Sequence, residues 1–182
     1  MQLDLLRDTA KAFPSVDDPK KIRSLRVWHC KYKSLDAIGE MRNLEELVVA
    51  GFPDESLGVL EGLLHLRYVS ILHLPKVSDL TPFRGLDLLE SLSLATSANW
   101  DAPGKKTVVK SLAPLAAMKS LKYLELFGVC PEERSLAALE ACKVLVSGRF
   151  SQYPAKEIAR FYSVMKIADA FNPKPNSQFG NH

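Results

Sequence analysis

Apolar residues recur along this chain in one spacing, apolar-x-x-apolar-x-apolar, which appears five times. The copies are Ile22/Leu25/Val27, Leu44/Leu47/Val49, Leu66/Val69/Ile71, Leu89/Leu92/Leu94 and Leu121/Leu124/Leu126. Their first residues lie 22, 22, 23 and 32 positions apart. The alternation at the end of each copy predicts a short strand with one buried face. We expect a degenerate sixth copy at Val144 and Val146.

A second apolar pattern follows each predicted strand. It reads SLDAIGEM from Ser34, SLGVLEGL from Ser56, DLTPFRGL from Asp79, SLAPLAAM from Ser111 and SLAALEAC from Ser135. Apolar residues stand at the second, fifth and eighth positions, which is typical of a short helical or 3₁₀ segment. Pro82 and Pro114 fall inside these segments, so we expect them to stay short.

One such unit cannot bury its own apolar face, but stacked units merge their apolar residues into a continuous core. The pattern resembles the leucine-rich repeat family, most closely its short 22-residue class of SDS22-like and internalin-like repeats. The resemblance implies an α/β solenoid, a horseshoe with a parallel concave sheet of five to six strands and short helical or 3₁₀ convex segments. The family usually has Asn at the ninth repeat position. Here that position holds Cys30, Phe52, Leu74, Ser97 and Val129, so packing must hold the turns.

The two ends of a solenoid expose core residues and need covers. We predict helical caps at both ends of a single domain, 1–171. Residues 1–21 would form the first cap, with an amphipathic helix through Leu3, Leu5, Leu6, Ala10 and Phe13. Residues 22–150 would form the repeats, and 151–171 a helical cap through Ile158, Phe161, Tyr162, Met165, Ala168 and Ala170. The tail, 172–182, has two prolines and no periodicity, which predicts disorder.

The period of two in a strand also predicts which residues point away from the core, onto the concave face. The first row is Ser24, Glu46, Tyr68, Ser91 and Tyr123. The middle row is Arg26, Val48, Ser70, Ser93 and Glu125, and the outer row is Trp28, Ala50, Leu72, Ala95 and Phe127. Exposed aromatic residues of this kind favour a protein interface. The alternative is that a cap, a loop or the C-terminal tail covers them.

A further row, Arg23, Glu45, Arg67, Glu90 and Lys122, alternates in charge and predicts a ladder of ion pairs between strands.

The longest interval contains an insertion, within residues 95–110, that leaves the C-terminal end of a strand. Pro103-Gly104 suits a type II turn, and Thr107–Val109 would form one arm of a small hairpin. Trp100 would then lean over Ala95 and Phe127. Insertions in repeat proteins tend to gather on the binding face, so this loop either extends the binding surface or shields it.

The composition limits the classes of partner and the compartment that we expect, but it indicates no mechanism. The chain is 47% apolar and 25% charged, with a net charge of +3 that gives no strong argument for a nucleic-acid or membrane partner. No apolar stretch is long enough to span a membrane, and no signal peptide is visible. Three cysteines without a CxxC motif favour a reducing compartment, and we expect a cytoplasmic protein.

Motifs for catalysis are missing from the sequence. DAPGKKT departs from a phosphate-binding loop, because Asn99 stands at the first Gly position and Lys106 where Ser or Thr is required. His29-Cys30 offers no set of metal ligands, and we expect neither a metal nor a cofactor.

We therefore predict a non-enzymatic protein-interaction module, acting as adaptor, regulator or inhibitor, including an immunity-type inhibitor, toward an unidentified protein partner. The predicted contact residues are Arg26, Trp28, Tyr68, Leu72, Trp100, Tyr123, Glu125 and Phe127. The alternative is a small-ligand-binding protein or enzyme with a site between the insertion and the sheet. A weaker third hypothesis is nucleic-acid binding through Arg26, Lys31, Lys33, Lys105 and Lys106.

Overall fold

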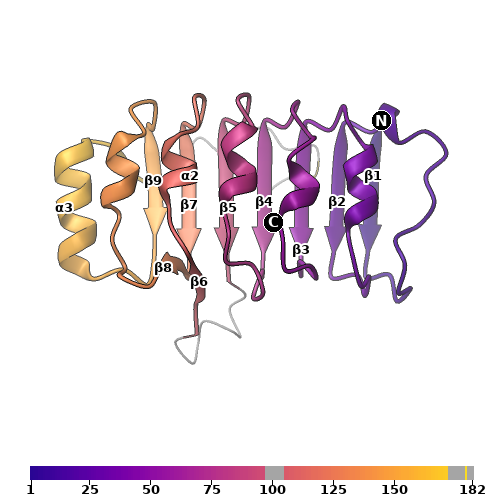
Figure 1. Ribbon diagram of the computed structural model, residues 1–182, viewed down its shortest axis with the longest axis horizontal. Helices are drawn as coiled ribbons and strands as arrows, with labels where there is room; N and C mark the ends of the chain where they lie inside the picture. Colours follow the sequence, from indigo (N-terminus) through magenta and orange to yellow (C-terminus); the bar gives the residue numbers. More distant parts are fainter. Residues whose placement is uncertain (97–104, 172–178, 180–182) are drawn as a thin grey trace.

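The computed structural model describes residues 1–96, 105–171 and 179 of the chain. Its main sheet has eight parallel strands in the order β1-β2-β3-β4-β5-β7-β9-β10 (Figure 1). These strands are β1 (Gln2–Leu6), β2 (Ser24–Trp28), β3 (Glu46–Ala50), β4 (Tyr68–Leu72), β5 (Ser91–Ala95), β7 (Tyr123–Phe127), β9 (Ser147–Phe150) and β10 (Ala168–Asp169). All five predicted strands are present, but the sheet is wider than the five to six strands expected.

Short helical segments connect successive strands along one face of the sheet (Figure 1). They are η1 (Pro19–Lys21), η2 (Asp36–Glu40), η3 (Gly58–Leu60), η4 (Thr81–Gly85), α2 (Ala113–Ala116) and η5 (Ala137–Ala141). All but the four-residue α2 are 3₁₀ turns, and both Pro82 and Pro114 stand near the start of their segments. The predicted short 3₁₀ or helical returns are confirmed.

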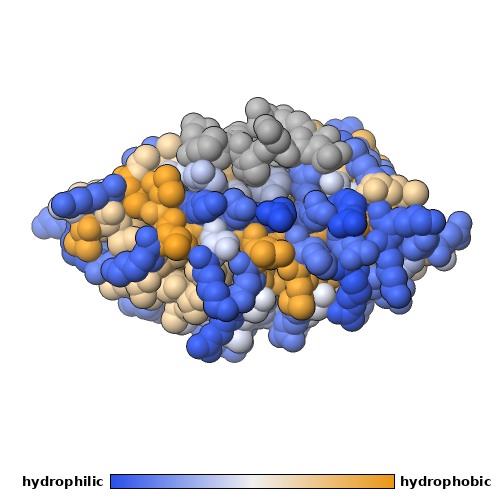
Figure 2. Space-filling model, turned by 90° about the horizontal axis from the view of Figure 1, so that it is seen from above, coloured by the Kyte–Doolittle hydropathy of each residue, from blue (hydrophilic) through white to orange (hydrophobic). Residues whose placement is uncertain are grey.

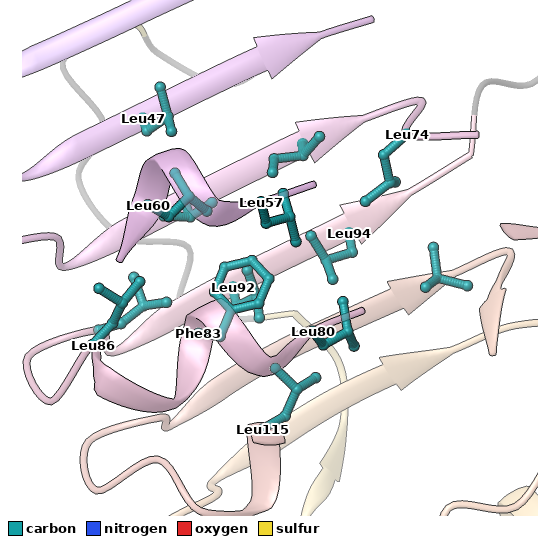
Figure 3. Packing of buried hydrophobic residues seen from close by; sticks show 14 of the residues in the cluster. Leu47, Leu57, Leu60, Leu74, Leu80, Phe83, Leu86, Leu92, Leu94 and Leu115 are labelled. Atoms are coloured by element: carbon teal, nitrogen blue, oxygen red, sulfur yellow. The ribbon is translucent and has the colours of Figure 1, made fainter. Parts of the chain in front are cut away.

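The core lies between the sheet and these returns. Leu92 and Leu94 of β5 point toward Leu80 and Phe83 of the return that precedes β5, and Leu57 and Leu60 fill the neighbouring layer (Figure 3). All of these side chains are at most 1% exposed. The layers repeat along the solenoid, so each unit covers the apolar face of the one beside it.

The turns after β2, β3, β4 and β7 each place a residue in the left-handed region of backbone space. His29, Gly51, His73 and Gly128 occupy equivalent positions, with φ between 52° and 86°. The next position in each turn is the one where Asn is usual. Phe52, Leu74 and Val129 stand there with side chains at most 3% exposed. Packing therefore holds these turns, as the sequence predicts.

The N-terminal segment corrects the prediction of a helical cap. Residues Gln2–Leu6 form strand β1, which pairs with β2 from Gln2 opposite Ser24 to Leu6 opposite Trp28. Leu3 and Leu5 pack against the core while Asp4 and Leu6 are exposed, which is a period of two rather than of a helix. Edge pairing on β2 satisfies its backbone, which a helix there would leave unpaired.

The C-terminal end also differs from the prediction in detail. The sixth unit uses Leu145, Gly148 and Phe150 as its inward positions, whereas Val144 and Val146 are exposed. Helix α3 (Ala155–Met165) is the expected cap, and Phe161 is fully buried in it. The helix ends at Lys166, which has a positive φ, so Ala168 belongs to β10 rather than to the helix.

The predicted charge ladder is present on the sheet. Arg23 pairs with Glu45 at 2.7 Å, and Glu90 accepts from both Arg67 at 3.4 Å and Lys122 at 3.1 Å. These side chains are well exposed, so each pair contributes only a few tenths of a kcal/mol.

Candidate functional site

The strands run in register, and this register builds the three predicted rows. Trp28, Ala50, Leu72, Ala95 and Phe127 stand opposite one another on successive strands, as do the residues of the first and middle rows. The sequence therefore predicts correctly which side chains share the concave face. Their role in binding stays a prediction.

The outer row alternates large and small side chains along the C-terminal ends of the strands. Trp28, Leu72 and Phe127 are half-buried and stand apart, separated by the two alanines. Trp28 also meets the ring of His29 edge to face, with 5.4 Å between ring centroids. Aromatic rings on a rigid sheet lose little conformational entropy when they bind, which suits them to anchor a partner.

Tyr68 and Tyr123 add two phenols to the same face from the first row, both half-buried. Burial raises the pKa of Tyr68, and the nearby carboxylates of Glu46 and Glu125 raise it further. The Tyr68 hydroxyl is therefore neutral at physiological pH and can donate as well as accept a hydrogen bond.

The middle row forms a polar network at its C-terminal side. The Ser93 hydroxyl donates to Glu125 Oε1 at 2.8 Å, and Arg149 Nε lies 2.9 Å from Glu125 Oε2. The Arg149 guanidinium carbon stands 5.1 Å from the centroid of the Phe127 ring. Arg149 extends the middle row onto β9. The predicted sixth copy at Val144 and Val146 is one position out of frame, so the sequence does not assign Arg149 to this row.

An equivalent group occupies the N-terminal side of the middle row. Arg26 Nε donates to Asp4 Oδ1 at 2.8 Å, and the Arg26 guanidinium carbon stands 5.0 Å from the centroid of the Phe179 ring. Asp4 extends the row onto β1. Sequence reasoning missed Asp4 because its segment had been read as a helix, and it missed Phe179 because the tail shows no periodicity.

Comparison with known proteins bears on the fold alone. No family model matches the chain, and no curated protein matches it. Among solved structures, it is similar to an internalin (inlF) from Listeria monocytogenes, with a TM-score of 0.63 and 18% identity over 87% of this chain. It is also similar to internalin C2 (inlC2) of that organism, with a TM-score of 0.52 and 20% identity over 69% of this chain. The fold is a leucine-rich repeat solenoid. The chain spans about half the length of these two structures, 44% and 50% respectively.

The insertion joins the leucine-rich repeat solenoid through a second, two-stranded sheet. Strand β6 (Thr107–Val109) pairs in parallel with β8 (Val129–Pro131), so Thr107–Val109 is not the arm of a hairpin, as was expected. Both strands lie at the edge of the main sheet where its strands end (Figure 1). Trp100 and the predicted Pro103-Gly104 turn lie outside the described residues.

Strand β6 is firmly docked beside the outer row. The Thr107 amide donates to the Gly128 carbonyl at 2.8 Å, directly after Phe127, and the Lys110 amide donates to the Ser78 carbonyl at 2.7 Å. Thr107 and Val109 are buried, and Val108 between them is exposed. The returning part of the insertion is thus a built element of the repeat fold.

Among the described residues of the leucine-rich repeat solenoid, few side chains are suited to metal binding or reactive chemistry. No three residues of the His, Cys, Asp or Glu types gather to hold a metal ion within 1–96, 105–171 and 179. Burial raises the pKa of the Cys130 and Cys142 thiols, which makes them less reactive. Within the same ranges, no helix has the length and apolarity that a membrane crossing requires.

The edge where the strands begin offers no comparable surface. It is mostly hydrophilic, with hydrophobic residues in separate areas (Figure 2). Leu64, Leu88, Val144 and Val146 are exposed in the turns that precede strands. Exposed apolar residues that stand apart in this way are normal on a protein surface. The concave face remains the better candidate site, because there the rows place their large side chains in fixed register.

Proposed function

We propose that this chain is a non-catalytic protein-interaction module that binds one protein partner through its concave face. The observation that carries the proposal is the outer row, where Trp28, Leu72 and Phe127 stand half-buried on a fixed sheet with small residues between them. Large side chains of a partner can enter beside the half-buried Ala95, while the rings provide the anchors.

The size of the face supports a wider contact that includes residues 95–110. From β1 to β9 there are six inter-strand steps of about 4.8 Å, and a five-residue strand is about 17 Å long. This gives a flat area of roughly 500 Å², below the ~800 Å² that each partner contributes to a standard interface. The insertion borders Phe127 through β6 and supplies the additional area in this proposal.

An adaptor, a regulator and an inhibitor, including an immunity-type inhibitor, all require this kind of contact. The proposal extends to the partner's surface, which would present apolar side chains to the outer row. We place this activity in the cytoplasm, because Cys30, Cys130 and Cys142 are all free and thiols persist in a reducing compartment.

The test is an affinity capture from native lysate with two matched triple variants. One variant replaces Trp28, Tyr123 and Phe127 with Ala. The other replaces the exposed Leu64, Leu88 and Val146 with Ala, and so removes apolar side chains from the strand-start edge instead. Interface anchors cost about 2 kcal/mol or more each when truncated, so the first variant should lose its partner and the second should keep it.

Thermal unfolding of both variants serves as the control for the fold. If the first variant remains folded and recovers the same partner in the same amount as the unmodified chain, the concave face is not the binding surface.

A further inference from the structure

Arg26 is held in a fixed position on the concave face before any partner arrives. Its Nε donates to Asp4 Oδ1 at 2.8 Å, and its Nη2 pairs with the other carboxylate oxygen. Two parallel bonds of this kind fix the plane of a guanidinium group. The Arg26 side chain is only 13% exposed, although it belongs to a row that faces away from the core. Another part of the protein therefore covers the Arg26 side chain on the concave side.

The described residue that lies over Arg26 is Phe179, three positions before the end of the chain. Its ring centroid is 5.0 Å from the guanidinium carbon, and the residue is only 9% exposed. Val48, which stands opposite Arg26 on β3, is 4% exposed, and Ala50 is 1% exposed. Both residues face away from the core, so the part of the face beside Arg26 is also shielded from solvent.

The other end of the middle row also combines an arginine, a carboxylate and an aromatic ring, but there the ring comes from a neighbouring strand. Arg149 pairs with Glu125 and stacks on Phe127, and both partners come from the neighbouring strand β7. The Arg149 side chain is 52% exposed. At the N-terminal side, the carboxylate comes from neighbouring β1, but the ring comes from the far end of the sequence. A ring supplied by the tail can leave without disturbing the sheet, whereas Phe127 cannot.

We infer that Arg26 and Asp4 form a receptor site for one aromatic side chain, and that Phe179 fills this site in cis. The inference rests on the proposed function and deepens it: the partner presents an aromatic residue to this site and must displace Phe179 to bind. The tail thereby sets a threshold on affinity, because a short tether keeps its ring at an effective concentration of about 1 mM. A weakly binding competitor does not displace Phe179 at that effective concentration, whereas a partner with several contacts does.

The length of the tail makes the contact possible and also testable. Asp169 on β10 is six inter-strand steps from β2, a distance of roughly 29 Å at about 4.8 Å per step. The ten residues from Asp169 to Phe179 reach at most about 34 Å. Removal of Lys174–Asn176 reduces this limit to about 24 Å, below the backbone separation, so the two side chains must bridge the remaining ~5 Å and the contact should weaken. Replacement of the same three residues by Gly-Ser-Gly keeps the length and provides the matched control.

The first measurement compares amide and guanidinium NMR signals of the full chain with those of its variants. Phe179→Ala, Phe179→Leu and the three-residue deletion should each shift the Arg26 Nε–H signal and the amides of β2 and β3. The Gly-Ser-Gly variant should leave them in place. Signals of Arg149 and β7 act as the internal reference, because their aromatic partner is Phe127. Identical Arg26 signals in the unmodified chain and in Phe179→Ala would overturn the inference.

The second measurement asks whether the site accepts a ring in trans. The probe is a synthetic peptide of residues 176–182, NSQFGNH, added to the full-length Phe179→Ala chain. It should shift the β2 and β3 signals saturably, and the same peptide with Ala in place of Phe should not. Occupancy in the unmodified chain should be about tenfold lower or less, because the tethered ring competes. Equal binding to both chains, or no shift up to about 10 mM peptide, contradicts a receptor site.

Both measurements use the isolated chain, so their outcomes do not depend on the result of the lysate capture. If capture through the concave face fails while the peptide binds, the receptor site is retained and the proposed function is not. Once a partner is in hand, Phe179→Ala should bind it about tenfold more tightly than the unmodified chain does.

Discussion

Single residues in the left-handed region continue the hydrogen bonding of the sheet at the ends of β2, β3 and β4. His29, Gly51 and His73 all have positive φ, and each donates its amide to a carbonyl of the next strand at 2.7–3.1 Å. The two histidines accept a conformation that costs a non-glycine residue about 1 kcal/mol or more. Gly128 has the same conformation with an additional constraint, because its α-carbon faces the Thr96 side chain.

Two alanine substitutions separate the conformational cost from the steric one. At Gly51 a Cβ would have no neighbour within 4 Å, so Gly51→Ala should lower the free energy of unfolding by about 1 kcal/mol through its φ of 86° alone. At Gly128 a Cβ would overlap the Thr96 side chain, so Gly128→Ala should cost about 2–4 kcal/mol. Urea unfolding measures both variants, and equal losses would show that Thr96 yields without cost.

The residues of the candidate site divide according to what a local pattern can reveal. Alternation within a strand is a local property, so Arg26, Trp28 and Phe127 could be assigned to the concave face from spacing alone. Phe179 could not, because its place depends on a contact between the two ends of the chain and no repeat marks it. Arg149 was lost through one frame error, which arose because Gly148 replaces the usual Leu.

At the scale of elements, the two ends of the solenoid solve the same problem differently. Strand β1 closes the N-terminal side by pairing with β2, and helix α3 covers the C-terminal side, where Phe161 and Phe150 meet edge to face at 5.4 Å between centroids. Polar contacts fix α3 to η5. Glu157 accepts the Leu136 amide at 2.7 Å, and Arg160 pairs with both Glu157 and Glu140.

Acid should loosen this cap. The hydrogen bond from Arg160, together with the Leu136 amide, lowers the pKa of Glu157 from 4.5 to about 2. A carboxylate with a depressed pKa stabilises the fold fully above its unfolded-state value and loses that contribution as pH falls through the folded value. We therefore expect a loss on the order of 1 kcal/mol between pH 4.5 and 2, since solvent screens part of the interaction.

The variant Glu157→Gln should remove this part of the pH dependence, as measured by urea unfolding at a series of pH values. Glu61→Gln changes an exposed carboxylate in a turn and provides the matched control. A pH profile of Glu157→Gln that coincides with that of Glu61→Gln would contradict the role given to Glu157.

The repeated strands in the middle of the chain could be predicted more completely than the N-terminal strand, for one physical reason. A central unit has neighbours on both sides, so its apolar spacing must match theirs. A terminal unit needs to match only one neighbour. The predicted N-terminal helix is wrong over Gln2–Leu6 because Leu3, Leu5 and Leu6 fit either period, and only the partner β2 decides between them.

For the whole molecule, stacking makes each layer of the core depend on the layers beside it. Phe83 lies among leucines of β5 and of the adjacent returns (Figure 3), and it is fully buried. We expect Phe83→Ala to lower the free energy of unfolding by about 3–5 kcal/mol, because the cavity lies between two halves of the stack. Leu5→Ala, at the partly covered N-terminal end, should cost about 1 kcal/mol.

Hydrogen exchange can locate the effect. In Phe83→Ala, amides of β4 and β5 should lose protection most strongly, whereas Leu5→Ala should affect β1 and β2. A uniform loss of protection in both variants would indicate that the solenoid opens only as a unit.

The unequal edges of the sheet also limit polymerisation. A parallel sheet of this kind could in principle add copies head to tail without end, the β1 edge of one molecule meeting the far edge of the next, to give a filament. Strand β1 presents five residues of backbone, but β10 presents only two, and α3 stands at that end (Figure 1). The C-terminal edge is thus a poor template for pairing with another molecule, so a filament does not extend from that end.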